Sequence, residues 1–315
     1  MRNYSKIINA FFGSEWAIQI EKLEAMLEFL NCKNAGIIFS AEQIQERISS
    51  GSEKTAFTSG QIAVLPLVGV ISSRMDLMES ISGGQSAETF GRQFDAAVND
   101  ADIAAIIIDI ESPGGTVQGV QELAAKIYAA RGRKKIIAVA NSFAASAAYW
   151  IGAAADEFVI TPSGEVGSIG VYTLHLDESE ADKQEGLKYT FISAGKFKIE
   201  GNSTQPLGDE AKAYYQGRVD ARYETFTGDV AKFRGVSKTD VKNNFGQGRM
   251  LLADDAKKAG MVDRIATLDE VIEELMNKKT KKSSTKSRAQ MEREHNFAGL
   301  KLSPKSYSVE KNKGS

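Results

Sequence analysis

The residues IIAVANSFAASAAYW (136–150) decide how the chain is interpreted, because they carry no charge and little bulk before Tyr149 and Trp150. The opening IIAVA (136–140) has the branched and small apolar residues of a strand buried on both faces. The alanines around Ser146 then predict a short turn followed by a buried helix. At the start of that helix Ser146 either allows close packing or acts as a nucleophile facing a cleft. The stretch alone leaves both possibilities open.

The segments on either side repeat the alternation of strand and helix. The runs QIAVLPLVGVI (61–71), AAIIIDI (104–110) and KIIAVA (135–140) are continuously apolar, whereas VQELAAKIYAA (120–130) has the apolar spacing of a helix. Continuous apolar strands separated by helices are typical of a sheet that helices cover on both faces. The sequence therefore predicts an α/β domain.

The composition is that of an ordinary globular protein. The 315 residues are 42% apolar and 25% charged, and the net charge of −2 gives no reason to expect a nucleic-acid partner. A single cysteine, Cys32, cannot form an internal disulfide, and the two histidines form no Cys/His cluster that would hold a structural zinc ion. We therefore expect neither a metal nor a cofactor.

One stretch has the length of a membrane span but not its composition. Residues 136–155 carry no charge. They are mostly alanine, with Asn141, Ser142, Ser146 and Gly152 among them, which favours a buried strand followed by a buried helix. The polar N-terminus also lacks the apolar core of a signal peptide. We expect a cytoplasmic protein with no membrane partner.

Changes in sequence pattern divide the chain into three predicted parts. Residues 1–55 form a helical extension, with helices expected over SEWAIQIEKLEAMLEFL (14–30) and SAEQIQERIS (40–49). Residues 56–275 form the α/β domain. Residues 276–315 form a basic tail that we expect to be flexible.

The tail allows two interpretations. Its segment KKTKKSSTKSR (278–288) is basic and rich in Ser and Thr, without any acidic residue. It is either a solubilising linker or an arm that docks to an acidic partner surface.

Two glycines after one predicted strand are candidates for an oxyanion hole. In IIIDIESPGGTVQG (106–119) a buried strand runs into Gly114 and Gly115 and then into a helix. Glycines at this position let backbone N–H groups approach a ligand closely. The motif lacks the spacing of a nucleotide-binding loop. The N–H of Ala147, next to Ser146, could face the same carbonyl oxygen.

A nucleophilic serine needs a base, and histidine is the first candidate. His295 lies in the tail, which leaves His175 with Asp177 close behind it. A Ser-His-Asp triad with Ser146 is therefore conceivable. A histidine in an alternating strand is, however, more often a packing or surface residue.

Lysine is the other candidate, because burial lowers the pKa of a lysine amine and lets it accept a proton. Lys196 and Lys198 follow a Ser-Ala-Gly turn within KYTFISAGKFKIEG (188–201), which we expect to form a strand. Most lysines are solvated surface residues, and spacing alone does not choose between these two.

An ordered set of motifs resembles a known family. SPGG (112–115), the small-residue serine motif, GEVGSIGV (164–171), a Gly-x-x-Lys turn and GRMLLADDAKKAGMVDRIATLDEVI (248–272) follow one another at these intervals. Together they resemble the signal peptide peptidase A family of serine peptidases, peptidase family S49, over residues 60 to 275. Each motif is weak singly, and the ordered set is specific. The resemblance implies a ClpP/crotonase-type fold with stacked β-sheets surrounded by helices.

The resemblance also implies roles for individual residues. By position, Ser146 is the nucleophile and Lys198, the third residue after Gly195, is the general base. Ser168, in GSIG, matches the serine that holds the lysine amine by a hydrogen bond. Lys196 falls one step into the turn and would face elsewhere.

The same carry-over gives the oxyanion donors. Gly115 and Ala147 are the implied N–H donors, and Gly114 is the neighbour that could replace Gly115. Crotonase relatives use such a hole on acyl-CoA thioesters, which leaves a non-proteolytic acyl-CoA-binding or assembly protein as an alternative. A Ser/Lys pair is explained only by the peptidase interpretation.

Within the family, the architecture looks most like the phage capsid-maturation (prohead) proteases, because the chain has a helical N-terminal extension and a basic tail. That branch implies a homo-oligomeric ring that cleaves scaffold, portal or capsid protein in the host cytoplasm, inside the procapsid. A bacterial, soluble signal-peptide-peptidase-like protease remains the alternative.

The helix expected over 208–235 carries aromatic residues and Arg222 at helical spacing, which predicts packing or subunit contacts.

Overall fold

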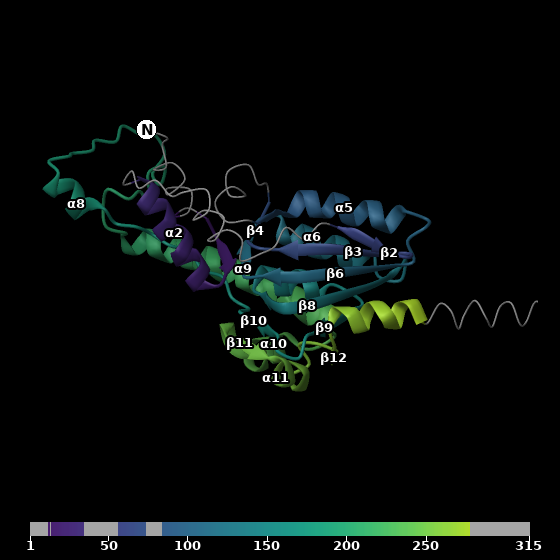
Figure 1. Cartoon of the computed structure of the whole chain (residues 1–315). Helices are drawn as coiled ribbons and strands as arrows, with labels where there is room; N and C mark the ends of the chain where they lie inside the picture. Colours follow the sequence, from purple (N-terminus) through teal and green to yellow (C-terminus); the bar gives the residue numbers. More distant parts are fainter. Residues whose placement is uncertain (1–11, 13, 35–55, 74–83, 278–315) are drawn as a thin grey trace, which may run out of the picture. The chain divides into compact units, whose positions relative to one another are not determined.

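The computed structural model describes residues 12, 14–34, 56–73 and 84–277 of the chain (Figure 1). The elements below belong to the unit that ends at Val271, apart from a helix over 268–277 that closes the described chain.

The larger sheet is built around three parallel strands, β3, β6 and β8, which lie side by side in Figure 1. The strand order is β11-β10-β8-β6-β3-β2, and β9 pairs with both β8 and β12. Its strands are β2 (Phe57–Ser59), β3 (Ile62–Val68), β6 (Ala105–Ser112), β8 (Lys135–Ala145), β9 (Glu157–Ile160), β10 (Glu165–Gly167), β11 (Met250–Leu252) and β12 (Arg264–Ile265). The Ile/Val runs of β3, β6 and β8 are almost wholly buried, as expected for a sheet covered on both faces. The predicted α/β class is confirmed.

A second, smaller sheet has the order β1-β7-β4-β5. Its strands are β1 (Trp16–Ile18), β7 (Gly114–Thr116), β4 (Ile71–Ser72) and β5 (Gln85–Ser86). Strand β7 follows β6 after a single residue, so Pro113 marks the point where the chain passes from one sheet to the other.

The helices of this unit differ in how deeply they are buried. They are α2 (Ile20–Asn34), α5 (Ala87–Asn99), α6 (Val120–Ala129), α7 (Ala147–Ala153), α8 (Ser179–Gln184), α9 (Asp209–Arg234), α10 (Lys238–Asn244) and α11 (Ala253–Lys258). Every residue of α7 is buried, whereas α5 and α6 bury one apolar face each. The alanines of α7 let it pack closely against the sheet and its neighbouring helices.

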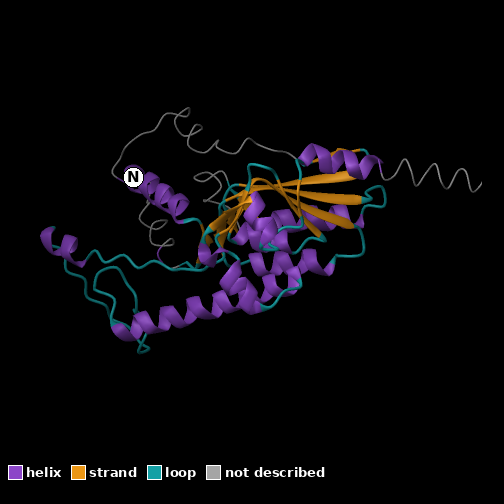
Figure 2. Cartoon of the chain, turned by 90° about the horizontal axis from the view of Figure 1, so that it is seen from below, coloured by secondary structure: helices purple, strands orange, loops and turns teal. Residues whose placement is uncertain are grey.

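The second half of α9, the long helix in Figure 2, packs against α7. The Trp150 ring stacks on Phe226 at a centroid distance of 4.4 Å, and its Nε1 donates to Asp229 at 3.2 Å. Arg131 donates to the carbonyl oxygens of Ala153 and Phe233, which come near the ends of the two helices. These contacts fix the C-terminal half of α9 and leave most of its first half exposed.

Three predicted elements need correction. The helix expected over 14–30 begins only at Ile20, because Trp16–Ile18 form a strand whose two edges both find partners. The turn expected after residue 140 is a continuation of β8, which pairs with β10 up to Ala145. In both places tertiary strand pairing overrides the local pattern.

The third correction concerns residues 188–201, which form no strand. The segment consists of irregular chain and turns, and its side chains up to Lys198 are exposed. A strand-like pattern forms a strand only where it pairs with another strand, and no strand of the described chain pairs with this segment. The helix predicted over 208–235 is confirmed as α9.

Other sequence predictions lie outside the described residues. They include the helix expected over 40–49, the tail from residue 278 and His295. The three-part division of the chain therefore stays a prediction. Within the described ranges, no helix is both long and apolar enough to cross a membrane, and no group of three or more His, Cys, Asp or Glu side chains could hold a metal ion.

Candidate active site

Ser146 occupies a strained position between β8 and α7. Its backbone angles are φ 54° and ψ −115°, which a non-glycine residue adopts only at a cost, and the residue is 1% exposed. The Ser146 N–H donates to the carbonyl oxygen of Gly167 at 2.7 Å, and its own carbonyl accepts from Trp150. The hydroxyl reaches one weak acceptor, the Gly170 carbonyl oxygen at 3.5 Å. The serine is therefore held by its backbone, while its hydroxyl makes no strong hydrogen bond to any described residue.

Ser168 directly follows Gly167, whose carbonyl oxygen accepts the hydrogen bond from the Ser146 N–H. This hydrogen bond brings the backbone of Ser168 close to that of Ser146. The φ of Ser168 is also 54°, and its N–H donates to the carbonyl oxygen of Arg249 at 2.9 Å. Two strained serines, each directly after one of two adjacent parallel strands, are thus brought near each other. Positive φ at a non-glycine residue tends to concentrate where function requires a fixed side-chain direction.

The glycine pair lies next to the residue that precedes Ser146. A Cβ atom on Gly114 would come within 3.0 Å of the Ala145 carbonyl oxygen, and one on Gly115 within 1.7 Å of the Ile71 carbonyl oxygen. Side chains are therefore excluded at both positions. The N–H of Gly114 already donates to the Ser112 hydroxyl at 3.2 Å, which argues against Gly114 as the oxyanion donor.

The N–H of Ala147 is the second predicted donor. As the first residue of α7, Ala147 has an N–H group with no acceptor inside the helix. This group follows Ser146 directly, which is the usual arrangement of an oxyanion hole around a strand–helix nucleophile.

Neither predicted base lies against Ser146 in the described chain. Lys198 is exposed in the irregular segment before α9, and its backbone N–H donates to the Gly195 carbonyl oxygen. Lys196 forms an exposed ion pair with Glu210. Within the described part of the chain, no hydrogen bond or ion pair connects either amine with the Ser146 hydroxyl.

The rival triad is not assembled either. The His175 Nε2 lies 3.1 Å from the carbonyl oxygen of Asn202, and Asp177 accepts a hydrogen bond from the Ser179 N–H. That hydrogen bond lowers the pKa of Asp177. In the described chain, His175 and Asp177 thus make their hydrogen bonds with residues other than Ser146.

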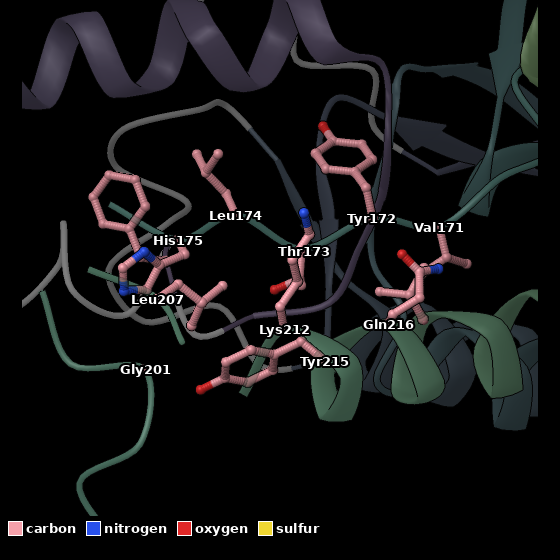
Figure 3. A pocket seen from close by; sticks show the side chains of 12 residues that line it. Val171, Tyr172, Thr173, Leu174, His175, Gly201, Leu207, Lys212, Tyr215 and Gln216 are labelled. Atoms are coloured by element: carbon pink, nitrogen blue, oxygen red, sulfur yellow. The ribbon is translucent and has the colours of Figure 1, made fainter. Parts of the chain in front are cut away.

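A pocket of about 380 Å³ lies between residues 171–175 and the first half of α9 (Figure 3). Lys212, Tyr215 and Gln216 enter it from α9, and His175 and Leu207 from the loops. Neither Ser146 nor Gly115 lines this pocket. It is a neighbour of the candidate active site and not the site itself.

Buried polar contacts hold α7, which carries the serine, in place. The Tyr149 hydroxyl donates to the Met261 carbonyl oxygen at 3.0 Å, and burial raises the pKa of this tyrosine. Burial also raises the pKa of Asp229, which accepts the hydrogen bond from Trp150. Each contact ties the helix after Ser146 to a distant part of the chain.

The sequence did not predict the ion pairs between Glu15 and two arginines of α9. Glu15 is held by Arg218 and Arg222, which lie four residues apart on one face of that helix. The only available signal was this i, i+4 pair of like charges, which is unfavourable without an anion nearby.

A buried, strained serine at a strand–helix junction, with two candidate backbone donors beside it, is the arrangement found in serine hydrolases. Residues 129–282 match the model of peptidase family S49. The chain therefore carries a peptidase family S49 domain, and the resemblance inferred from its motifs is confirmed.

Relatives from phages and bacteria match over most of this chain. The head-tail preconnector protein GP5 of Enterobacteria phage P21 and the capsid assembly protease C of Escherichia phage lambda are each 29% identical over 211 residues. That match covers 67% of this chain and 42% and 48% of the two proteins. Protease 4 of Haemophilus influenzae is 29% identical over 229 residues, or 70% of this chain and 35% of that protein. The chain thus spans less than half the length of these relatives.

Among solved structures, a ClpP1 mutant from Listeria monocytogenes aligns with 66% of this chain and 94% of its own, at 16% identity and a TM-score of 0.39.

Proposed function

We propose that the chain is a serine peptidase in which Ser146 is the nucleophile and Lys198 the general base. The observation that carries this proposal is the strained, buried Ser146, whose preceding residue lies next to the Gly114–Gly115 pair, in a chain with a family S49 domain. A fixed backbone directs the hydroxyl, which makes only a weak hydrogen bond within the described residues and so stays available for attack.

The proposed reaction is an acyl transfer in two stages. The Ser146 oxygen attacks the carbonyl carbon of a peptide bond while a neutral lysine amine takes the hydroxyl proton. The N–H groups of Gly115 and Ala147 stabilise the negative oxygen that forms. The protonated lysine then gives its proton to the leaving amine, and water hydrolyses the acyl ester by the same route. Ser168 orients the lysine amine by a hydrogen bond.

In this proposal the lysine comes from a neighbouring copy of the chain in a ring. Lys198 ends a segment, residues 187–198, whose large apolar side chains are exposed to an unusual degree, Ile192 to 99%. Exposed apolar side chains gathered on one segment favour a protein interface. The others are Leu187, Tyr189, Phe191 and Phe197. A second copy that covers them would also bring an amine to Ser146.

The proposed biological role is the processing of scaffold, portal or capsid proteins during phage head maturation. Two relatives are named for phage head assembly, the capsid assembly protease C and the head-tail preconnector protein. The protein would then work in the host cytoplasm and inside the procapsid. The basic tail, residues 276–315, would dock to an acidic surface of the assembling shell.

The test of the peptidase proposal is labelling with a fluorophosphonate probe, which reacts with activated serines. Wild type should be labelled once per chain, and Ser146→Ala should not be labelled. Ser142→Ala is the matched control, because this exposed serine on β8, the strand that leads to Ser146, also has a positive φ. His175→Ala should be labelled like wild type. Equal labelling of Ser146→Ala and wild type would refute the proposal.

A further inference from the structure

Strand β1 lies between two chain segments and is hydrogen-bonded to both. On one side, Trp16 and Tyr172 exchange two backbone hydrogen bonds, of 2.8 and 3.0 Å. On the other side, the Val117 N–H donates to the Glu15 carbonyl oxygen at 3.1 Å, and β1 runs antiparallel to β7. Since neighbouring strands lie about 4.8 Å apart, the space that β1 fills is the width of one extended peptide.

The two segments that enclose β1 are those of the candidate active site. Strand β7 contains Gly115, and Tyr172 follows shortly after Ser168 along the chain. Ala17 lies directly opposite Gly115 in the antiparallel register. A Cβ on Gly114 would meet the Ala17 carbonyl oxygen at 2.2 Å and the Ala145 carbonyl oxygen at 3.0 Å. The Ala17 carbonyl is thus the one that β1 presents to the glycine pair, close to the residue before Ser146.

The side chain two residues earlier, Glu15, enters a charged pocket. Its side chain is 4% exposed, and its Oε1 accepts from Arg218 Nε at 2.8 Å. Its Oε2 accepts from Arg222 Nε at 2.9 Å and from Gln118 Nε2 at 3.3 Å. None of these three partners belongs to the N-terminal segment, so the pocket persists if β1 leaves.

Trp16 differs in this respect. It belongs to an apolar cluster with Leu23, Met26 and Leu30 of α2, in the same N-terminal segment, and with Val70 and Tyr172. Part of the environment of Trp16 would therefore leave with β1, and this side chain says less about other peptides. Glu15 and Ala17 instead face residues outside the N-terminal segment, so these two side chains indicate which substrate side chains the groove accepts.

We propose that β1 is an internal occupant of the peptide-binding groove, and that Arg218, Arg222 and Gln118 form a subsite for an acidic side chain of the substrate. This inference rests on the proposed function of Ser146. The acidic residue lies two positions before the residue whose carbonyl faces Gly115, and that latter residue is small, as Ala17 is.

The charges explain why the subsite selects an acid. Two guanidinium groups four residues apart on one helix repel each other when no anion lies between them. A carboxylate satisfies both through charge-assisted hydrogen bonds, whereas an amide satisfies them poorly and an amine adds a third positive charge. Because β1 and a substrate need the same two edges, β1 competes with the substrate for the groove and lowers its apparent affinity.

The experiment compares three fluorogenic peptides on the full chain: Ser-Glu-Trp-Ala-Ile-Gln and the same peptide with Gln or Lys in place of Glu. We expect kcat/KM for the Glu peptide to exceed that for the Gln peptide by about tenfold or more, mainly through KM. The Lys peptide should be the poorest. Glu15→Gln should raise kcat/KM for the Glu peptide several-fold, because β1 is then held less tightly.

Charge reversal tests the two arginines directly. In the double variant Arg218→Glu, Arg222→Glu the Lys peptide should become the preferred substrate. Lys212→Glu, an exposed cation earlier on the same helix, is the matched control and should keep the preference for the Glu peptide. The peptide series on wild type needs no variant to fold, so the inference stays testable if a variant aggregates.

The outcomes separate this inference from the peptidase proposal. If Ser146 is labelled and all three peptides are cleaved with equal kcat/KM, the acidic subsite is refuted and the peptidase proposal stands. If Ser146 is not labelled and no peptide is cleaved by any of these proteins, the peptidase proposal fails and this inference fails with it.

Discussion

The strain at Ser146 predicts that the protein is more stable with glycine at this position than with alanine. The φ of 54° is left-handed, and the ψ of −115° lies outside the left-handed well, so the conformation belongs near the upper end of the usual range, at about 3 kcal/mol. Glycine adopts these angles without this strain.

Two costs of glycine reduce that gain. Its greater freedom in the unfolded chain costs about 0.7 kcal/mol, and the lost burial of one methyl group costs about 0.8 kcal/mol. The difference leaves Ser146→Gly about 1.5 kcal/mol more stable than Ser146→Ala. For a domain of roughly 200 residues this corresponds to a Tm higher by about 3–6 °C.

Calorimetry or urea unfolding of the two variants measures this difference, and both variants should lack peptidase activity. The matched control is Ala148→Gly, inside α7, where glycine relieves no strain. There the change should destabilise by about 2 kcal/mol, from helix propensity and lost burial. If Ser146→Gly is no more stable than Ser146→Ala while the control behaves as expected, the strain argument is wrong.

Three further predictions concern the base, acid stability and the tail. Lys198→Ala should be nearly inactive, whereas Lys196→Ala should stay active. Mixing Lys198→Ala chains with Ser146→Ala chains should restore cleavage, because each intact residue can then meet its partner across a subunit contact. A mixture as inactive as its components would argue against a lysine supplied by a neighbouring copy. Burial by itself would raise the pKa of Asp263. Its ion pair with an arginine and the hydrogen bond from a backbone N–H outweigh this effect, so that its pKa lies below the ordinary value of about 3.8. Asp263 therefore stabilises the fold above about pH 4, and the advantage of wild type over Asp263→Asn in unfolding free energy should shrink as pH falls below that value; a constant difference from pH 2 to 7 would contradict this. Truncation after Leu275 should leave short-peptide cleavage intact and weaken co-assembly with the scaffold partner, which equal co-assembly by both proteins would disprove.

Much of the central sheet could be predicted because its signals are local. Continuous Ile and Val runs between helical segments favour buried strands, and the alanines after residue 145 favour a closely packed helix. The junction at Ser146 follows from these two signals together. The resemblance gave Ser168 a role but no position, and its place near Ser146 follows from the parallel pairing of β8 and β10.

The N-terminal strand could not be predicted in the same way. Trp16–Ile18 directly precede a helical pattern, and only the distant partners Gly115 and Tyr172 make a strand of them. The opposite error occurred at residues 188–201, where a strand-like pattern finds no sheet edge in the described chain. Both misses arise because strand formation depends on pairing partners, which a local pattern does not contain.

The central claim is that the Ser146 hydroxyl performs the chemistry. It is tested most directly by kcat/KM for the Ser-Glu-Trp-Ala-Ile-Gln peptide, measured on wild type and on Ser146→Ala at equal concentration. Removing one hydroxyl next to alanines changes the packing very little, so the variant should keep its fold and lose cleavage by at least about 10³-fold. A folded Ser146→Ala protein that cleaves the peptide within about threefold of the wild-type rate would contradict the account.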